Sequence, residues 1–151
     1  MNALRLPASK STLPLISRLM LAAVFLLGML AYGQARAELP PLQHLGSVDY
    51  VSGGIGIDES TAFKAAMSQF PLALTFASNR DGTAAYVSDV QVVIRDSHDT
   101  EVLNVASEGP YFLARLPAGK YKIFAHYNGN THSRTAEIGN SGTVRLMFEW
   151  K

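Results

Sequence analysis

Hydrophobic and polar residues alternate with a period of two over most of the chain beyond residue 71. Every second residue of 72–76 is large and apolar, and Val90, Val92 and Ile94 share one face of a later stretch. Successive side chains of a β-strand point to opposite faces of its sheet, so this period predicts strands with one buried face. A short candidate at 48–51 precedes expected strands at 72–77, 86–95, 101–106, 111–113, 120–127, 131–138 and 143–150.

Turn-forming residues separate these stretches about every eight to twelve residues, a spacing typical of β-sandwiches. Clusters of Asn, Asp, Ser and Gly lie at 79–82, 96–99 and 139–142, and Asn128-Gly129 is a strong β-hairpin signal. We therefore predict an all-β, seven-stranded sandwich of immunoglobulin-like architecture.

A short helix is expected before the alternating region. Asp58 is placed to cap it, residues 59–69 are rich in helix-forming residues, and Pro71 ends it. The glycine-rich run 52–57 links this helix to the strand before it. One domain at 48–151 is predicted, after an extended, proline-containing spacer at 38–47.

Residues 1–37 follow a different pattern. Positions 1–18 are basic without an acidic residue, 19–31 are apolar, and Ala35 and Ala37 place small residues where signal peptidase requires them. This order predicts a secretory signal peptide cleaved after Ala37, and hence a periplasmic or secreted protein. An uncleaved membrane anchor is the alternative, but a spanning helix needs about 20 apolar residues, more than 19–31 supplies.

Composition narrows the chemistry. The chain has 151 residues, is 48% hydrophobic and has no cysteine, so it has a globular composition and no disulfide, thiolate nucleophile or cysteine-ligated metal. Four of its 13 basic residues precede Ala37 and all 12 acidic residues follow it, which leaves nine basic residues and a net charge of −3 beyond the leader. A slightly acidic domain without a basic cluster argues against nucleic acid as a partner, and limits membrane contact to the export signal.

Three segments of the second half resemble the carboxypeptidase regulatory-like domain, a transthyretin-like β-sandwich. The matching strings are Val90-x-Val92-x-Ile94-x-Asp96, Glu108-Gly109-Pro110-Tyr111-Phe112 and Leu116-Pro117-Ala118-Gly119-Lys120-Tyr121, followed by Asn128-Gly129. The resemblance implies that the third string is a turn feeding a core strand. The family's usual Asp-x-x-Gly turn has Asp99 in place of glycine here.

The same resemblance implies an accessory module and no enzymatic activity. Related 5-hydroxyisourate hydrolases end in Tyr-Arg-Gly-Ser, whereas this chain ends Met147-Phe148-Glu149-Trp150-Lys151, so that activity is not transferred. The run 50–59 also resembles a segment joined to this domain in exported bacterial proteins, and it implies no activity.

Two histidines flank the predicted hairpin turn. A three-residue loop centred on Gly129 would place His126 opposite His132, close enough to share a metal ion, whereas a two-residue loop would break that pairing. With Tyr121 and Ile123 facing inward, His126 and Lys122 face solvent. Without a third ligand, we predict no metal site.

Other polar clusters have structural interpretations. Asp96, His98, Asp99 and Glu101 lack the glycine of a calcium loop, so a solvated turn is expected. The run 52–56 precedes a helix as phosphate loops do, but Glu59 occupies the fingerprint's third glycine position, so a bend is expected.

No serine has the surroundings of a nucleophile, and Gly-x-Ser-x-Gly is absent from the sequence. The aromatic residues at strand positions are expected in the core, with a binding platform as the alternative, and they are Tyr86, Tyr111, Tyr127 and Trp150.

The sequence therefore predicts a non-enzymatic exported module, without catalytic residues or cofactors, that contacts an envelope or periplasmic protein. A small carbohydrate- or ligand-binding module is the alternative, and a hydrolase or metal-dependent enzyme the third possibility. The glycine run and the start of the helix are the predicted interaction surface, comprising Gly53, Gly54, Ile55, Gly56, Asp58 and Glu59.

Overall fold

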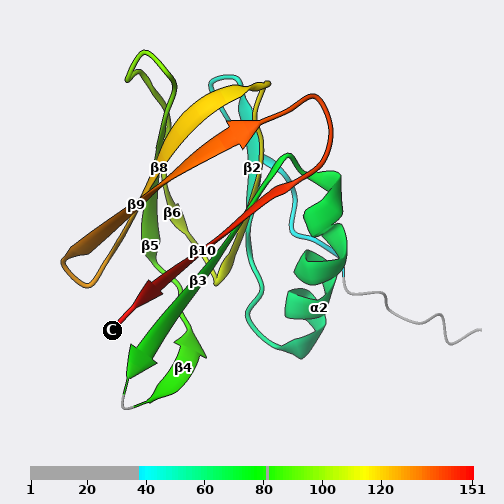
Figure 1. Ribbon diagram of the computed structural model, residues 1–151. Coiled ribbons are helices and arrows are strands. Elements are labelled where there is room, and N and C mark those ends of the chain that lie inside the picture. Colours follow the sequence, from blue (N-terminus) through cyan, green and yellow to red (C-terminus); the bar gives the residue numbers. More distant parts are fainter. Residues whose placement is uncertain (1–37, 81) are drawn as a thin grey trace, which may run out of the picture. The chain divides into compact units, whose positions relative to one another are not determined.

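A computed structural model describes residues 38–80 and 82–151, whose strands form two β-sheets (Figure 1). The predicted signal peptide at 1–37 lies outside the described residues. Within the described ranges, none of the helices is both long and apolar enough to span a bilayer.

Strands dominate the chain order. The elements are β1 (Gln43–Leu45), β2 (Val48–Gly53), α2 (Ile57–Ala66), a 3₁₀ turn (Met67–Gln69), β3 (Leu72–Arg80), β4 (Thr83–Tyr86), β5 (Val90–Arg95), β6 (Glu101–Ser107), β7 (Tyr111–Arg115), β8 (Gly119–Tyr127), β9 (Asn130–Ile138) and β10 (Val144–Trp150).

The first sheet has the order β1-β2-β7-β3-β10, with β4 also paired to β3, and the second has the order β6-β5-β8-β9. β10 runs parallel to β3, and the other described pairs are antiparallel. The all-β, two-sheet prediction is confirmed. The count of seven strands is wrong, because the described residues form ten.

The alternating residues fill the space between the sheets, as predicted. Leu72, Leu74 and Phe76 of β3 face the inward residues of β5 and β8, and all are buried. Phe148 and Trp150 of β10 close the same core, where both rings contact Phe76. Burial of these large side chains contributes about 1.5–3 kcal/mol each and is the main stabilising term.

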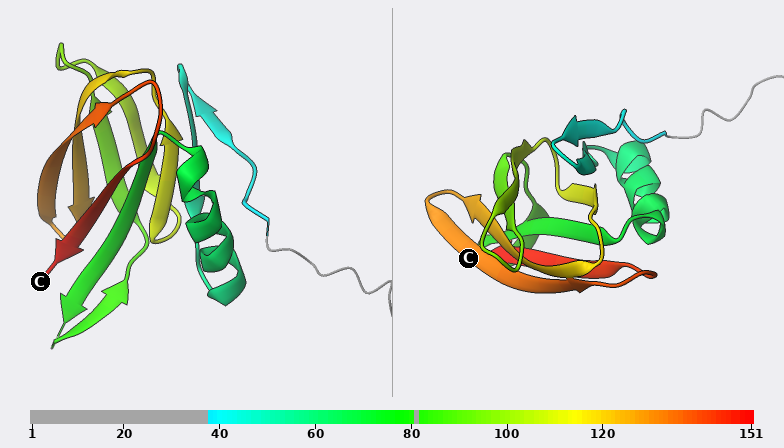
Figure 2. Two further views of the ribbon diagram at one scale, coloured as in Figure 1. Left: turned by 45° about the vertical axis from the view of Figure 1, so that its right-hand side comes forward. Right: turned by 90° about the horizontal axis from the view of Figure 1, so that it is seen from above.

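Helix α2 covers the other face of the first sheet. Its Phe63 is fully buried in a second cluster with Val51, Ala73, Tyr111 and Leu113. Figure 2 shows the helix on the side of this sheet that faces away from β8 and β9. The central strands of the first sheet are therefore buried on both faces.

The helix begins earlier than the sequence predicts. Helix α2 starts at Ile57 after a Gly56 N-cap without a side-chain hydrogen bond, so the predicted cap at Asp58 is wrong. Asp58 instead lies in the first turn, where a negative charge is favourable because it faces the positive end of the helix dipole. The amide of Ser60 donates the first backbone bond to Gly56, 3.1 Å away.

Two predicted boundaries also differ. The expected strand at 86–95 is two strands, because the chain crosses from the first sheet to the second between β4 and β5. The expected spacer at 38–47 contains β1, which pairs with β2, and its Leu39 packs against the helix cluster. Asn79 and Arg80, expected in a turn, extend β3 to meet β4.

Candidate functional site

The glycine run is shaped by close packing. Gly53 and Gly54 are buried and have positive φ values of 155° and 93°. A Cβ at Gly54 would overlap the ring of Tyr111, and one at Gly53 would overlap the carboxylate of Glu59 and the ring of Phe63. These two glycines therefore let the chain turn against the aromatic rings, as the bend interpretation predicts.

The connection between β6 and β7, residues 108–110, packs against the end of β2. Gly109 lies against the backbone of Gly53 without room for a Cβ. The hydroxyl of buried Ser52 accepts a 3.0 Å hydrogen bond from the amide of Glu108, and the hydroxyl of buried Ser107 donates to the Gly109 carbonyl at 2.7 Å. The glycine run and the connection from β6 to β7 are thus held together by hydrogen bonds and close packing.

Strands β4 and β7 meet end to end along one side of β3. Tyr111 of β7 pairs with Thr75, and Tyr86 of β4 pairs with Ala77. Between them, Phe76 donates its amide hydrogen to Pro110 at 2.9 Å and accepts one from Val87 at 3.3 Å. The segment that leaves β4 and the segment that enters β7 diverge at Phe76, and a depression lies there beside the glycine run.

This depression is an open pocket of about 460 Å³. Its walls come from the glycine run and the start of helix α2, and from the segment that follows β4. The lining residues are Gly54, Ile55, Gly56, Ile57, Ser60, Tyr86, Val87, Ser88 and Pro110. Most of them are apolar, and none carries a charge.

Large apolar side chains are exposed around the pocket. Ile55, Ile57 and Tyr86 are 66%, 83% and 58% exposed. On the far side of Tyr86, a smaller depression of about 170 Å³ is lined by alanines and half-exposed Met147. We call the pocket together with Met147 and Ala84 the apolar patch.

Tyr111 lies beneath this patch and supports it. Its ring is buried, stacks on Phe63 with centroids 6.0 Å apart, and contacts the ring of Tyr86 at 5.6 Å. Burial, together with the neighbouring Tyr86 phenol, raises the pKa of the Tyr111 hydroxyl. That hydroxyl is buried without a hydrogen-bond partner among the described residues, so Tyr111 remains neutral and acts as a packing residue.

The predicted interaction surface is only partly a surface. Gly53 and Gly54 are buried, whereas Ile55, Gly56 and Asp58 are exposed and Glu59 is half-buried. Tyr86 completes the pocket together with Val87, Ser88 and Pro110. From the sequence, Tyr86 was named only as part of an alternative aromatic platform, and the other three residues were missed. Proline and glycine near 109–110 indicated a turn, but no local signal places that turn beside residue 55.

Of the two hairpin loop lengths that the sequence leaves open, the structure has the shorter one, so His126 and His132 do not pair. The hairpin has the two-residue turn Asn128-Gly129, with φ values of 46° and 79°, so Tyr127 faces Asn130. His126 then lies opposite Thr131, which it contacts at 2.8 Å, and His132 lies on the other face of the sheet. In the described part of the chain, no three His, Asp or Glu residues are grouped so that they could hold a metal ion.

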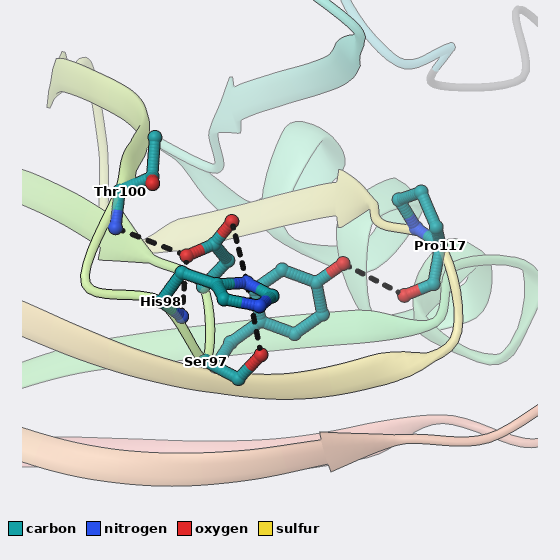
Figure 3. Close-up of polar contacts among 6 residues, drawn as sticks. Ser97, His98, Thr100 and Pro117 are labelled. Carbon is teal, nitrogen blue, oxygen red and sulfur yellow. Dashed lines mark hydrogen bonds and ion pairs between the residues drawn. The ribbon is translucent and has the colours of Figure 1, made fainter.

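The acidic cluster after β5 forms a turn, as predicted (Figure 3). The Asp96 carboxylate accepts hydrogen bonds from the backbone amides of Thr100 at 3.0 Å and His98 at 2.8 Å. The Thr100 amide and then the His98 amide hold the pKa of Asp96 below its ordinary value. Asp99 takes the positive φ of 63° that glycine would otherwise supply, and its carboxylate pairs with Arg95 at 3.2 Å.

The aromatic residues divide between core and surface. Tyr111 and Trp150 are buried and Tyr127 packs partly buried against the core, as predicted, but Tyr86 is exposed. A pocket of about 290 Å³ contains Trp150 with Asn130, His132, Glu149 and Lys151. There the indole nitrogen donates to the Asn130 carbonyl at 3.1 Å, and His132 stacks on the ring at 5.3 Å.

The chain matches no known protein-family model, and no curated protein is significantly similar to it.

Proposed function

We propose that the protein is a non-enzymatic β-sandwich module that binds another protein through the apolar patch. The observation that carries this proposal is the clustering of exposed apolar side chains around one pocket. Of the six large apolar residues exposed among the described positions, four belong to the patch: Ile55, Ile57, Tyr86 and Met147. Contiguous exposed apolar surface rimmed by polar residues is typical of sites that bind a macromolecule.

The lining supports a protein partner over a polar metabolite. Ser60 and Ser88 supply the only side-chain hydroxyls in the pocket apart from the Tyr86 phenol, and the remaining lining is aliphatic or glycine. Pockets for small ligands usually add several converging polar groups that fix the ligand's orientation. An apolar side chain of a partner needs no such groups.

The setting of this module remains a proposal from the sequence. The basic and apolar pattern of 1–37, followed by Ala35-Arg36-Ala37, supports export to the periplasm or beyond, with a partner at the cell envelope. The strings at 90–96, 108–112 and 116–121 support a place among the carboxypeptidase regulatory-like domains, whose members are accessory modules.

Site-specific photocrosslinking of the full chain in cells tests the function. A photoreactive residue at Ile57, in the patch, is compared with one at Lys122, exposed on the outside of the second sheet. We expect a discrete adduct from position 57 that is absent from position 122 and is lost with Tyr86→Ser. Equal labelling from both positions, or no adduct at 57, contradicts the proposal.

A second candidate is a module for a carbohydrate or another small ligand. The pocket beside Trp150 favours it, because it combines an indole with Asn130, His132 and Glu149. Sugar binding needs an open aromatic face, however, and Trp150 is only 3% exposed with His132 stacked on its ring. Binding there requires His132 to move, so a glycan that binds wild type and His132→Ala alike would contradict this candidate.

A further inference from the structure

Strand β4 is short and has a free edge that carries neither a charged residue nor a proline. Among the described residues it pairs only with β3, and its four residues, Thr83–Tyr86, are all exposed. Sheet edges are usually shielded by charged side chains, proline or a covering loop, whereas the sequence Thr-Ala-Ala-Tyr has neither charge nor proline. This edge is therefore available to another strand.

The backbone groups that face outward can be assigned. The amide of Val87 donates to Phe76 of β3, and Ala85 lies opposite Ser78. Hydrogen-bonding groups alternate along an antiparallel pair, so those of Val87 and Ala85 point toward β3. The amide and carbonyl groups of Ala84 and Tyr86 consequently point to the free edge.

The line along this edge is where β2 would continue. β7 and β4 lie end to end on the same side of β3, and β2 pairs with β7 only as far as Gly53 and Tyr111. Beyond Gly53 the chain turns into the glycine run and helix α2. The pocket lies between that run and the end of β4, so a strand added to β4 would pass directly beside it.

Several residues next in the chain to the pocket lining are acidic, and we call them the acidic rim. Three chain neighbours of lining residues carry carboxylates, namely Asp58, Glu59 and Asp89, and none of those neighbours is basic. Asp58 and Asp89 are exposed. Lys64 lies one helical turn beyond Ser60, with its ammonium group 6.0 Å from the Tyr111 ring centroid.

We infer that the partner supplies an extended basic segment that adds to β4 as a strand, places an apolar side chain in the pocket and sets a Lys or Arg against the acidic rim. This inference rests on the proposed function and specifies its ligand. Main-chain hydrogen bonds to Ala84 and Tyr86 provide affinity, and the pocket and the rim provide specificity. Complementary charge also speeds association and rejects acidic segments.

Peptide titration followed by NMR tests the inference. The probes are two nine-residue peptides that alternate leucine with polar residues, one with three lysines and the other with three glutamates in the same places. The lysine peptide should shift the amide signals of Ala84, Tyr86 and Ile57, and the glutamate peptide should not. Equal binding of the two peptides, or no shift at these residues with the lysine peptide, overturns the inference.

Substitutions in β4 separate strand addition from simple apolar contact. Ala84→Pro removes the outward amide and keeps the pairing with β3, because proline is tolerated where its nitrogen faces away from the ladder. It should weaken binding of the lysine peptide about five- to tenfold, since one hydrogen bond contributes about 1 kcal/mol. The matched control Ala84→Ser keeps the amide and should bind as wild type does. Unchanged binding by a folded Ala84→Pro overturns strand addition.

Charge reversal provides a test that does not depend on that proline. The double variant Asp58→Lys and Asp89→Lys changes two exposed side chains and should reverse the preference, so that the glutamate peptide binds more tightly. A retained preference for the lysine peptide contradicts the acidic rim as the selective element. Failure of these peptide tests with a discrete photocrosslink still formed at position 57 leaves the protein-binding function standing and removes only the strand and its charge.

Discussion

The outer faces of the two sheets are built in opposite ways. The outside of the first sheet is apolar and is covered by helix α2 through Phe63, Tyr111 and Leu113. The outside of the second sheet is polar and uncovered. Exposed or half-exposed side chains there include Gln91, Arg95, Lys122, Phe124 and His126.

The difference explains why the candidate site lies where it does. A polar sheet face can be exposed to solvent, and no large apolar side chain of β5, β6, β8 or β9 is exposed. The first sheet requires a cover, and helix α2 protects only part of it. Tyr86 and Met147 are not covered by the helix and remain exposed. The patch is thus the uncovered end of a face that is otherwise core.

The largest expected effect comes from removing the helix anchor. Phe63→Ala should lower the free energy of unfolding by about 3–5 kcal/mol, because the ring is fully buried and leaves a cavity. Phe124→Ala on the outside of the second sheet is the matched truncation. Its ring lies half-buried between Arg95 and Lys122, so about 1 kcal/mol or less is expected. Urea denaturation measures both, and equal losses would mean that the two faces do not differ.

A smaller effect is expected from two glycines in the loop. Gly54→Ala should cost about 2–4 kcal/mol, because its added methyl group overlaps Tyr111 at a φ of 93°. Gly56→Ala has a similar φ of 88° with open space around it, so it should cost about 1–2 kcal/mol. The difference in melting temperature between the two variants measures the packing alone. If they melt together, the glycine run is needed only for its backbone angles.

The smallest effect is expected at Asp96, on the polar side. Its pKa is lowered in the folded state, mainly by the Thr100 amide, so the ionised carboxylate stabilises the fold above the unfolded value of about 3.9. That contribution is lost as pH falls through the lower folded pKa. Asp96→Asn should therefore melt slightly below wild type at pH 7 and together with it near pH 2. A deficit that persists in acid would assign the effect to geometry and not to charge.

Local periodicity was sufficient to predict the core. Burial of Val90, Val92 and Ile94 follows from alternation alone, because a strand with one apolar face must direct that face toward the core. The Asn128-Gly129 hairpin was also readable, but its loop length was not settled by the sequence. One residue of register decides whether His126 and His132 share a face.

The sequence predicted only one wall of the pocket, the one formed by the glycine run and the start of helix α2. Residues 53–59 were selected because a glycine run between a strand and a helix indicates an unusual backbone conformation. The other wall depends on the meeting of β4 and β7 at Phe76, a contact between segments far apart in the chain. The break between β4 and β5 did have a local signal, because Ser88 and Asp89 are turn-forming residues and Asp89 has a positive φ of 59°.

The parallel pairing of β10 with β3 has a consequence for the order of folding. Trp150 of β10 pairs with Ser78 of β3, and its indole seals the core against Phe76. Pairing β3 with β10 closes the long segment between them, residues 81–143. This closure costs chain entropy before contacts are gained, which slows folding. The first sheet cannot be completed before β10 has left the ribosome, so the core beside β3 stays open in a nascent chain until that strand has emerged.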